Sequence, residues 1–324
     1  MSIQARMWAA VLAGAVCLVA AGRVSADDAP PAPAAEDLSP ASPVSGTLFI
    51  AGGGKVPEKV LEDFVARAGG ENAHIAVVTT ASETAETSDV ESRLVFWRSL
   101  RLSEVSVVHA PSRDIADDPK FAQQFATATG VWFIGGHQER LTSTYLGTRT
   151  EKAIKAVLKR GGVVGGTSAG AAIMSQLMIV GGNPAIPGEG FGFLPGTLVD
   201  QHFLKRKRED RLKHLLQRYP RLVGLGIDEN TVLVVHGRTL TVHGETNESK
   251  VIVCMAPVGD KPAVRDELCT GAEQDLLALS RAAVSRVEPR FSFEDETIEP
   301  EVSQGTLIVA GGGDVPEDAA ERFV

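Results

Sequence analysis

The segment Gly166-Thr167-Ser168-Ala169-Gly170 has the G-x-S-x-G spacing of a nucleophile elbow. An apolar run at 162–165 precedes it and the small residues 171–174 follow it, which predicts a strand, a sharp turn and a helix. A serine on such a turn lies at a helix start, where backbone N–H groups can stabilise an oxyanion. We therefore predict that Ser168 is the nucleophile of an acyl transfer. The alternative is a glycine-rich turn in which Ser168 only caps the helix.

A serine nucleophile needs a base, and the chain offers seven histidines. His202 follows the apolar run 197–199 and precedes a basic stretch, so it stands where a strand is expected to end. Polar residues at the carboxyl end of a strand are typical of a ligand site. Most of the other histidines lie in or beside strand-like runs, where surface or structural histidines are common. We predict His202 as the base.

A second polar turn, Gly135-Gly136-His137-Gln138, follows the apolar run Trp132–Ile134. If the strands are parallel, this turn lies at the same edge of the sheet as the serine. The N–H of Gly136 and the N–H of Ala169 then become candidate oxyanion donors, and Gln138 a candidate for orienting substrate. The alternative is an ordinary turn in which the glutamine starts a helix.

Three arginines follow His202 at close spacing: Arg206, Arg208 and Arg211. The planar guanidinium of arginine binds carboxylates through two parallel hydrogen bonds, so these residues are candidates for an acidic substrate. The alternative is a solvated basic helix face, and the nearness of His202 favours substrate binding.

The elements that must position these residues alternate along the chain. Short apolar runs are separated by helical stretches near 57–67, 90–100, 119–128, 141 and 151–159. Strands that are apolar on both faces and alternate with helices predict a parallel sheet covered on both sides. Four closely spaced runs between 223 and 255 predict a β-rich, partly antiparallel edge, followed by a helix near 272–282. The predicted fold is therefore α/β, a three-layer sandwich with a mostly parallel sheet.

Composition limits the possible functions. The chain has 324 residues, 44% of them hydrophobic, and a net charge of −9, which gives no general attraction to nucleic acid. Three cysteines exclude a disulfide scaffold; we expect Cys254 to be a buried strand residue, and a pairing of Cys254 with Cys269 is the alternative. No spacing of His, Cys, Asp and Glu fits a metal site, so we expect neither metal nor cofactor.

The sequence also predicts segments outside the catalytic domain. Residues 1–26 resemble a cleaved signal peptide, with Arg6 before an apolar run and small residues before the cleavage position, so we expect export and no membrane span in the mature chain. We expect a flexible tether at 27–45, the catalytic domain at 46–285 and a linker at 286–304. Residues 305–324 are identical to residues 46–65 at 13 of 20 positions, which predicts the truncated start of a second repeat.

Several motifs together resemble those of cyanophycinases, in the aspartyl dipeptidase (peptidase E) group of serine peptidases. They are GGTSAGAAIM, DQHF with R-x-R-x-x-R, GFLPG at 192–196 and GIDENT at 226–231. The resemblance implies a fold like that of class I glutamine amidotransferases, a homodimer, and hydrolysis of the β-aspartyl–arginine bond of cyanophycin. By the same resemblance, Ser168 is the nucleophile and His202 the base. Substrate-pocket positions fall on Gln138, Asp200, Gln201, Arg206, Arg208 and Arg211.

The third member of the triad stays open at this stage. The resemblance implies an acidic residue in the loop before GFLPG, where the only acid is Glu189. Asn183 is the second candidate, because an amide can orient a histidine. Otherwise an acid from elsewhere acts, or the chain is an impaired homologue that binds peptide or polymer without cutting it. An α-aspartyl dipeptidase is a further alternative.

Overall fold

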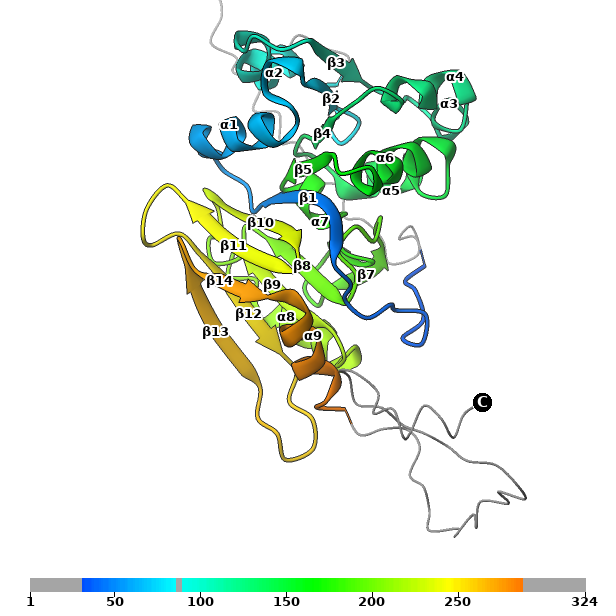
Figure 1. The fold of residues 1–324 in the computed structure, drawn as a ribbon. Helices are drawn as coiled ribbons and strands as arrows, with labels where there is room; N and C mark the ends of the chain where they lie inside the picture. Colours follow the sequence, from blue (N-terminus) through cyan, green and yellow to red (C-terminus); the bar gives the residue numbers. More distant parts are fainter. Residues whose placement is uncertain (1–30, 86–88, 288–324) are drawn as a thin grey trace, which may run out of the picture. The chain divides into compact units, whose positions relative to one another are not determined.

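An eight-stranded sheet forms the centre of the computed structural model, which describes residues 31–85 and 89–287 (Figure 1). Its strand order is β14-β11-β10-β1-β5-β4-β2-β3. The five strands from β1 to β3 in this order are parallel, and β10, β11 and β14 extend the sheet antiparallel. The bounds are β1 Val44–Ala51, β2 His74–Val78, β3 Glu104–Val108, β4 Gly130–Phe133, β5 Val163–Thr167, β10 Thr231–Gly237, β11 Thr239–Gly244 and β14 Glu273–Asp275.

A second sheet of four strands has the order β13-β12-β9-β8. Strands β8 and β9 are parallel, and β12 and β13 continue antiparallel. A separate hairpin joins β6 to β7. The bounds are β6 Leu177–Gly181, β7 Ile186–Glu189, β8 Thr197–Gln201, β9 Val223–Ile227, β12 Lys250–Met255 and β13 Val264–Cys269.

The helices are short and mostly amphipathic. In α6 the apolar positions at the spacing of a helix face, Ile154, Val157 and Leu158, are buried against the sheet, as expected for such a pattern. The α-helices are α1 Glu58–Arg67, α2 Asp89–Ser99, α3 Arg113–Ala116, α4 Pro119–Ala122, α5 Gln138–Tyr145, α6 Arg149–Lys159, α7 Ala169–Ala172, α8 Glu209–Arg218 and α9 Leu276–Val284, with 3-10 turns at Gly70–Asn72 and Gln123–Phe125.

Both faces of the central sheet are covered. Side chains alternate along β1, so Leu48 and Ile50 pack into one core while Phe49 and Ala51 pack into the other. On the Phe49 side, the rings of Phe49, Phe64, Trp97 and Trp132 meet with centroids 5.3–5.6 Å apart. The prediction of an α/β fold with a largely parallel sheet is confirmed.

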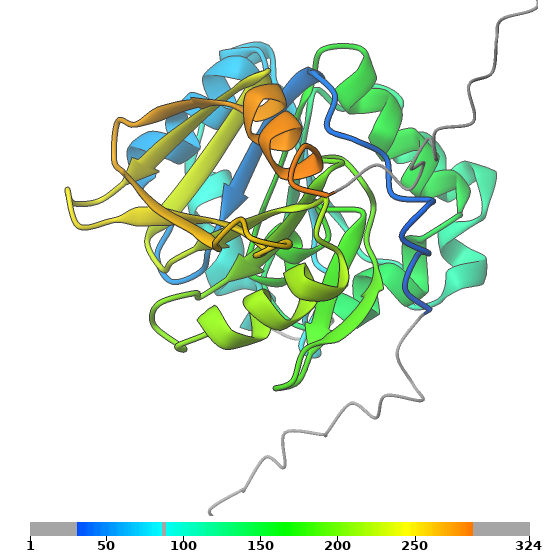
Figure 2. The same cartoon turned by 90° about the horizontal axis from the view of Figure 1, so that it is seen from below.

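The second sheet is also covered on both faces. Val251 and Val253 of β12 belong to the same core as Leu233 and Val235 of β10. Ile252 and Cys254 pack against Leu212 and other residues of α8. Figure 2 shows α8 in yellow-green and α9 in orange on different sides of this sheet. Because β8 and β9 are parallel neighbours, their carboxyl ends lie side by side. Residues that are distant in the sequence therefore meet at this edge of the sheet.

Some sequence-based predictions were wrong in detail. The expected helix at 119–128 is two short pieces, α4 and a 3-10 turn, and Asp118 caps the first by accepting from Lys120 N. The helix expected from 272 starts only at Leu276, because Asp275 caps it and the preceding residues form β14.

The described part of the expected tether packs on the domain. Ser39 N donates to Oε1 of Gln176, and β1 begins at Val44, before the predicted boundary. The predicted signal peptide, the second repeat and nearly all of the linker at 286–304 lie outside the described residues.

The two described cysteines are both free thiols. Cys254 is buried on β12, as predicted, and its burial raises the pKa of its thiol to about 11. Cys269 is exposed on β13, where it stands opposite Lys250 and not opposite Cys254. This register holds the two thiols apart.

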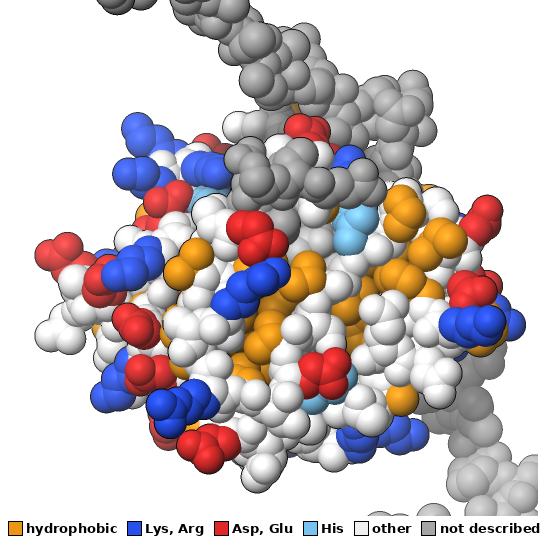
Figure 3. All heavy atoms as spheres, turned by 90° about the horizontal axis from the view of Figure 1, so that it is seen from above, with side chains coloured by type: hydrophobic (Ala, Val, Ile, Leu, Met, Phe, Trp, Pro, Cys, Tyr) orange, Lys and Arg blue, Asp and Glu red, His pale blue; other side chains and the backbone are white. Residues whose placement is uncertain are grey.

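In the part of the chain that the structure describes, no helix is long and apolar enough to cross a bilayer. The face around α2, β2 and β3 carries acidic and basic side chains interspersed around apolar ones (Figure 3).

Candidate active site

Ser168 lies on a strained turn between β5 and α7. Its backbone has φ 54° and ψ −108°, a conformation that a side chain adopts only when the surroundings impose it. The turn is tight because Gly166 and Gly170 approach each other: a Cβ on Gly166 would lie 2.7 Å from the backbone of Gly170. Ser168 N donates to Ala51 O at the end of β1, which fixes the turn to the neighbouring strand. The strand, elbow and helix predicted from the sequence are present.

His202 reaches this serine from the end of β8. Its Nε2 lies 2.8 Å from Oγ of Ser168, within the distance of a hydrogen bond. His202 also has a positive φ of 50°, and its N–H donates to Gly52 O at 2.7 Å. Gly53 makes room for the ring, since a Cβ there would lie 2.2 Å from Cε1 of His202. The turn after β1 therefore holds the imidazole in place.

Glu229 completes a chain of three polar side chains. Its Oε1 lies 2.7 Å from Nδ1 of His202. A carboxylate on Nδ1 keeps the proton on that nitrogen and leaves Nε2 free to accept the proton of Ser168. The side chain of His202 is 9% exposed and that of Glu229 is 27% exposed.

The electrostatics of the site favour the neutral imidazole of His202. Burial lowers the pKa of His202 below its ordinary value; the hydrogen bond and charge of Glu229 oppose this, while Arg206 and Arg208 lower it further. A neutral imidazole is the form that can accept a proton from a serine. The base form of His202 is thus present at lower pH than in a free histidine.

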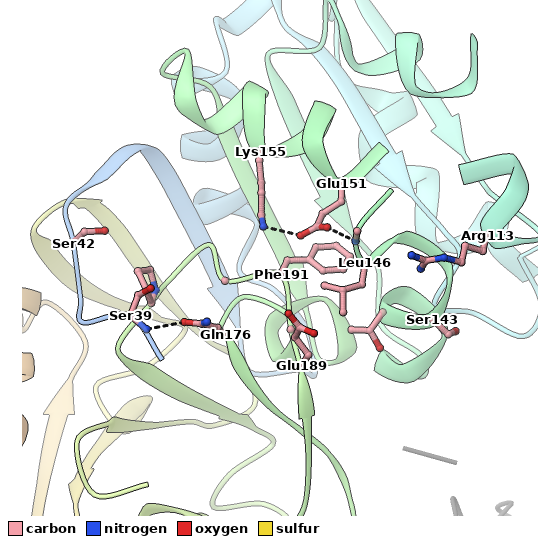
Figure 4. Close-up of a pocket in the computed structure, with 15 residues that line it drawn as sticks. Ser39, Ser42, Arg113, Ser143, Leu146, Glu151, Lys155, Gln176, Glu189 and Phe191 are labelled. Carbon is pink, nitrogen blue, oxygen red and sulfur yellow. Dashed lines mark hydrogen bonds and ion pairs between the residues drawn. The ribbon is translucent and has the colours of Figure 1, made fainter. Parts of the chain in front are cut away.

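The acidic partner of His202 is not either of the residues proposed from the loop. Glu189 lies on β7 in a separate cavity of about 760 Å³, together with Arg113 and Lys155 (Figure 4). Asn183 is exposed in the turn of the β6–β7 hairpin. Neither contacts His202, whose two ring nitrogens meet Ser168 and Glu229. The available signal was the GIDENT motif at 226–231, in which Glu229 stands two residues after the end of β9.

The two predicted oxyanion donors belong to segments that lie next to Ser168. Gly135 lies against the serine, because a Cβ on it would be 3.3 Å from Cβ of Ser168, and Gly136 follows at φ 154°. Among the hydrogen bonds of the described residues, none uses the N–H of Gly136 or of Ala169. The two predicted oxyanion donors therefore stay candidates, on either side of the nucleophile.

The three arginines after His202 have different surroundings. Arg211 is buried and forms a two-pronged ion pair with the fully buried Asp200, with Nε to Oδ2 at 2.7 Å and Nη2 to Oδ1. This fork is occupied inside the protein, where the pair links β8 to α8, and substrate binding by Arg211 and Asp200 stays a prediction. Arg206 is exposed, and its charge acts on His202.

Arg208, Gln201 and Gln138 already form hydrogen bonds within the protein. Arg208 donates from Nη1 to the backbone and side-chain oxygens of Gln201 at 2.6 and 2.7 Å. Gln138 donates from Nε2 to the carbonyl of Ile179 at 3.0 Å and to that of Val180, which ties α5 to β6. Within residues 31–85 and 89–287, no group of three or more His, Cys, Asp or Glu side chains is placed to hold a metal ion.

This arrangement agrees with comparisons to known proteins. A family model for peptidase family S51 matches residues 48–243, more than half of the chain, and this span includes Ser168, His202 and Glu229. The chain belongs to peptidase family S51. This S51 serine peptidase is 35% identical over 187 residues to a cyanophycinase of Geminocystis herdmanii, a match that covers 55% of this chain and 68% of the relative.

Two further similarities define the extent of the match. A cyanophycinase of Synechococcus elongatus is 34% identical over 184 residues, which cover 53% of this chain but only 56% of the relative. A solved peptidase of an acI-B1 actinobacterium superposes with a TM-score of 0.56 at 24% identity, covering 72% of this chain and 98% of that one. This structural likeness supports the fold alone.

Proposed function

We propose that this S51 peptidase hydrolyses β-aspartyl–arginine bonds, as found in cyanophycin, through an acyl-enzyme on Ser168. The observation that carries the proposal is the chain of hydrogen bonds from Ser168 through His202 to Glu229 at a strained elbow. The relatives named cyanophycinase support the substrate class.

The first half of the reaction transfers the acyl group to the enzyme. As Oγ of Ser168 attacks the β-carbonyl carbon, its proton passes to Nε2 of His202, and Glu229 stabilises the imidazolium that forms. The N–H groups of Gly136 and Ala169 hold the developing oxyanion. His202 then gives the proton to the departing amine of arginine, the C–N bond breaks, and a β-aspartyl ester of Ser168 remains.

The second half of the reaction hydrolyses this ester and releases the aspartate. Water attacks the ester carbonyl while Nε2 of His202 accepts its proton, and the same proton returns to Oγ of Ser168 as the aspartate leaves. Within the protein, the proton moves only between Oγ of Ser168 and Nε2 of His202, which lie 2.8 Å apart, so the relay uses no other side chain.

Arg206 is the arginine best placed to bind a substrate carboxylate. It is exposed, it follows the base by four residues, and its charge lowers the pKa of His202. Arg208 has one nitrogen bound to Gln201, and Arg211 is occupied by Asp200. The aspartate backbone of the polymer presents carboxylates that match such a guanidinium.

A substrate panel with a matched pair of variants tests the proposal. Ser168→Ala is expected to abolish hydrolysis of a β-aspartyl-arginine dipeptide and of cyanophycin, and to abolish labelling by a fluorophosphonate. Ser143→Ala, an exposed serine on α5, serves as the control and should behave like the unmodified protein. Cleavage of α-aspartyl dipeptides alone would favour an aspartyl dipeptidase. Absence of labelling of the unmodified protein would favour a binding homologue without activity.

Export and dimer formation belong to the same proposal. The apolar N-terminal run supports export, and the resemblance to cyanophycinases supports a homodimer. Amino-terminal sequencing of the protein from its native compartment tests cleavage after Ala26, and light scattering tests the dimer.

A further inference from the structure

A side chain of α2 forms a hydrogen bond to the carbonyl of the peptide that joins Gly135 to Gly136. A trans peptide unit is planar, so the carbonyl of Gly135 and the N–H of Gly136 lie in one plane and point in opposite directions. Nη1 of Arg93 donates to Gly135 O at 2.8 Å, across 42 positions of sequence. The N–H on the other end of this plane is the proposed oxyanion donor, next to Ser168.

We propose that Arg93 is a positioning residue of the oxyanion hole, which sets the orientation of the Gly135–Gly136 peptide and strengthens the Gly136 N–H as a donor. This inference rests on the proposed function, because it requires that Gly136 binds the oxyanion.

The peptide needs such a contact because glycines flank it on both sides. Rotation of a glycine–glycine peptide plane meets no Cβ, so the carbonyl and the N–H can exchange places at low cost. A Cβ on Gly136 would lie 2.1 Å from Ala81 O, so that position cannot be stiffened by a larger residue. The next contact along the loop is His137 N to Ala81 O at 2.9 Å, which fixes the following peptide and not this one.

The second oxyanion candidate is held differently. The carbonyl that shares a plane with Ala169 N–H is that of Ser168, and it accepts from Ala171 N and Ala172 N, each at 3.0 Å. The first turn of α7 therefore fixes one donor with backbone alone. The orientation of the other donor depends on Arg93, a side chain from a distant helix, so a substitution at this position can change it.

A guanidinium also changes the strength of the donor. A charge-assisted hydrogen bond to a carbonyl polarises the whole amide, so the N–H on the same plane becomes a better donor. This effect matters most in the transition state, when negative charge collects on the substrate oxygen, and less in the substrate complex. Loss of Arg93 should therefore lower kcat and leave KM nearly unchanged.

The test compares two arginines of the same helix. Arg93→Met removes the donor but keeps much of the side-chain length, and Arg93→Lys keeps a cation without the planar fork. Arg98→Met is the control, because Arg98 is exposed on α2 and pairs with Glu91 at 3.0 Å. The measurements are kcat and KM with a β-aspartyl-arginine dipeptide, the rate of labelling by a fluorophosphonate, and the melting temperature.

The expected loss follows from the role of one donor. Removing a whole oxyanion donor costs about 10²–10³ in kcat, so misorienting one should cost about 10- to 100-fold. We expect this loss in both kcat and labelling rate for Arg93→Met, a smaller loss for Arg93→Lys, and partial rescue of Arg93→Met by millimolar guanidinium. Arg98→Met should match the unmodified protein, and all melting temperatures should agree.

The labelling arm separates this inference from the proposed function. The fluorophosphonate places an oxygen in the oxyanion site and has no carboxylate, so a substrate-binding role of Arg93 would change KM and not labelling. Equal labelling rates for Arg93→Met and the unmodified protein would overturn the inference alone. If β-aspartyl-arginine is not cleaved but labelling still depends on Arg93, the inference stands and only the substrate is wrong. No labelling of the unmodified protein would overturn both.

Discussion

Replacement of Glu229 by glutamine should nearly abolish activity, although Glu229 does not touch the substrate in the proposed mechanism. Its Oε1 lies 2.7 Å from Nδ1 of His202, so the two charge centres of the pair are about 4 Å apart during the reaction. At an effective dielectric constant of about 20 this attraction is about 4 kcal/mol. Because the carboxylate is 27% exposed and solvent screens its charge, we reduce this attraction to about 3 kcal/mol, which corresponds to roughly 150-fold in rate.

A second effect increases this loss. The amide of glutamine can donate to Nδ1, which places the imidazole proton on Nε2, where it blocks acceptance of the proton of Ser168. Loss of the orienting acid can cost about 10⁴-fold in kcat in a related triad. We therefore expect Glu229→Gln to lower kcat by about 10³- to 10⁴-fold.

The pH profile gives an independent measure. Burial already lowers the pKa of His202, and the charge of Glu229 partly opposes this. Activity needs the neutral imidazole, so kcat/KM should rise with pH through this lowered pKa and reach its plateau at lower pH than an ordinary histidine allows. Without the carboxylate, the pKa falls further, and the rising limb should move to still lower pH while the plateau drops.

The assay is hydrolysis of a β-aspartyl-arginine dipeptide between about pH 4 and 9, a range that brackets the ordinary pKa of histidine. Glu189→Gln is the matched control, because Glu189 was the acid expected from the sequence yet lies in a separate cavity. A profile of Glu189→Gln that loses the plateau, together with normal turnover of Glu229→Gln, would refute the reasoning from the structure.

Three further predictions follow from the same geometry. Gly53→Ala should lower kcat by at least about 100-fold, because its Cβ would displace the ring of His202; hydrolysis assays with intact melting temperature check this. Arg211→Lys should lower the melting temperature by roughly 5–10 °C through the buried pair with Asp200, whereas the exposed Arg206→Lys should change only KM; equal melting temperatures would contradict this difference. Truncation after Pro300 should leave melting and turnover unchanged, because the sheet position that residues 305–324 would copy is already filled by β1 between β10 and β5; a large loss of stability would contradict it.

Local patterns in the sequence predicted the candidate nucleophile and the candidate base, which the structure places within hydrogen-bond distance of each other. The elbow at Ser168 is visible because its strand, glycines and helix are contiguous, and a turn of this kind depends on neighbouring residues alone. His202 was recognised as a polar residue at the end of an apolar run, which β8 confirms as a strand. The alternation of strands and helices gave the fold class for the same reason.

Only the tertiary structure decided which acid orients the histidine. Glu229 is 27 residues beyond His202, and the parallel register of β8 and β9, with Gln201 opposite Ile227, brings the residues after both strands together. Gly226 permits this pairing, because its missing Cβ leaves space for the ring of Phe203. A strand register depends on the packing of a whole sheet, so the GIDENT motif could mark Glu229 as a polar residue after a strand but could not show that it meets His202.

Burial likewise separated arginines that the sequence left equivalent. Arg206, Arg208 and Arg211 share one short run, but α8 begins at Glu209 and turns Arg211 inward onto Asp200, while Arg206 stays exposed. A buried carboxylate must be paired, so Asp200 determines which arginine is removed from the surface. The sequence thus determined the chemistry that the chain carries, and the packing of two sheets decided which side chains perform it, because contacts between distant strands and the desolvation of charge exist only in the folded protein.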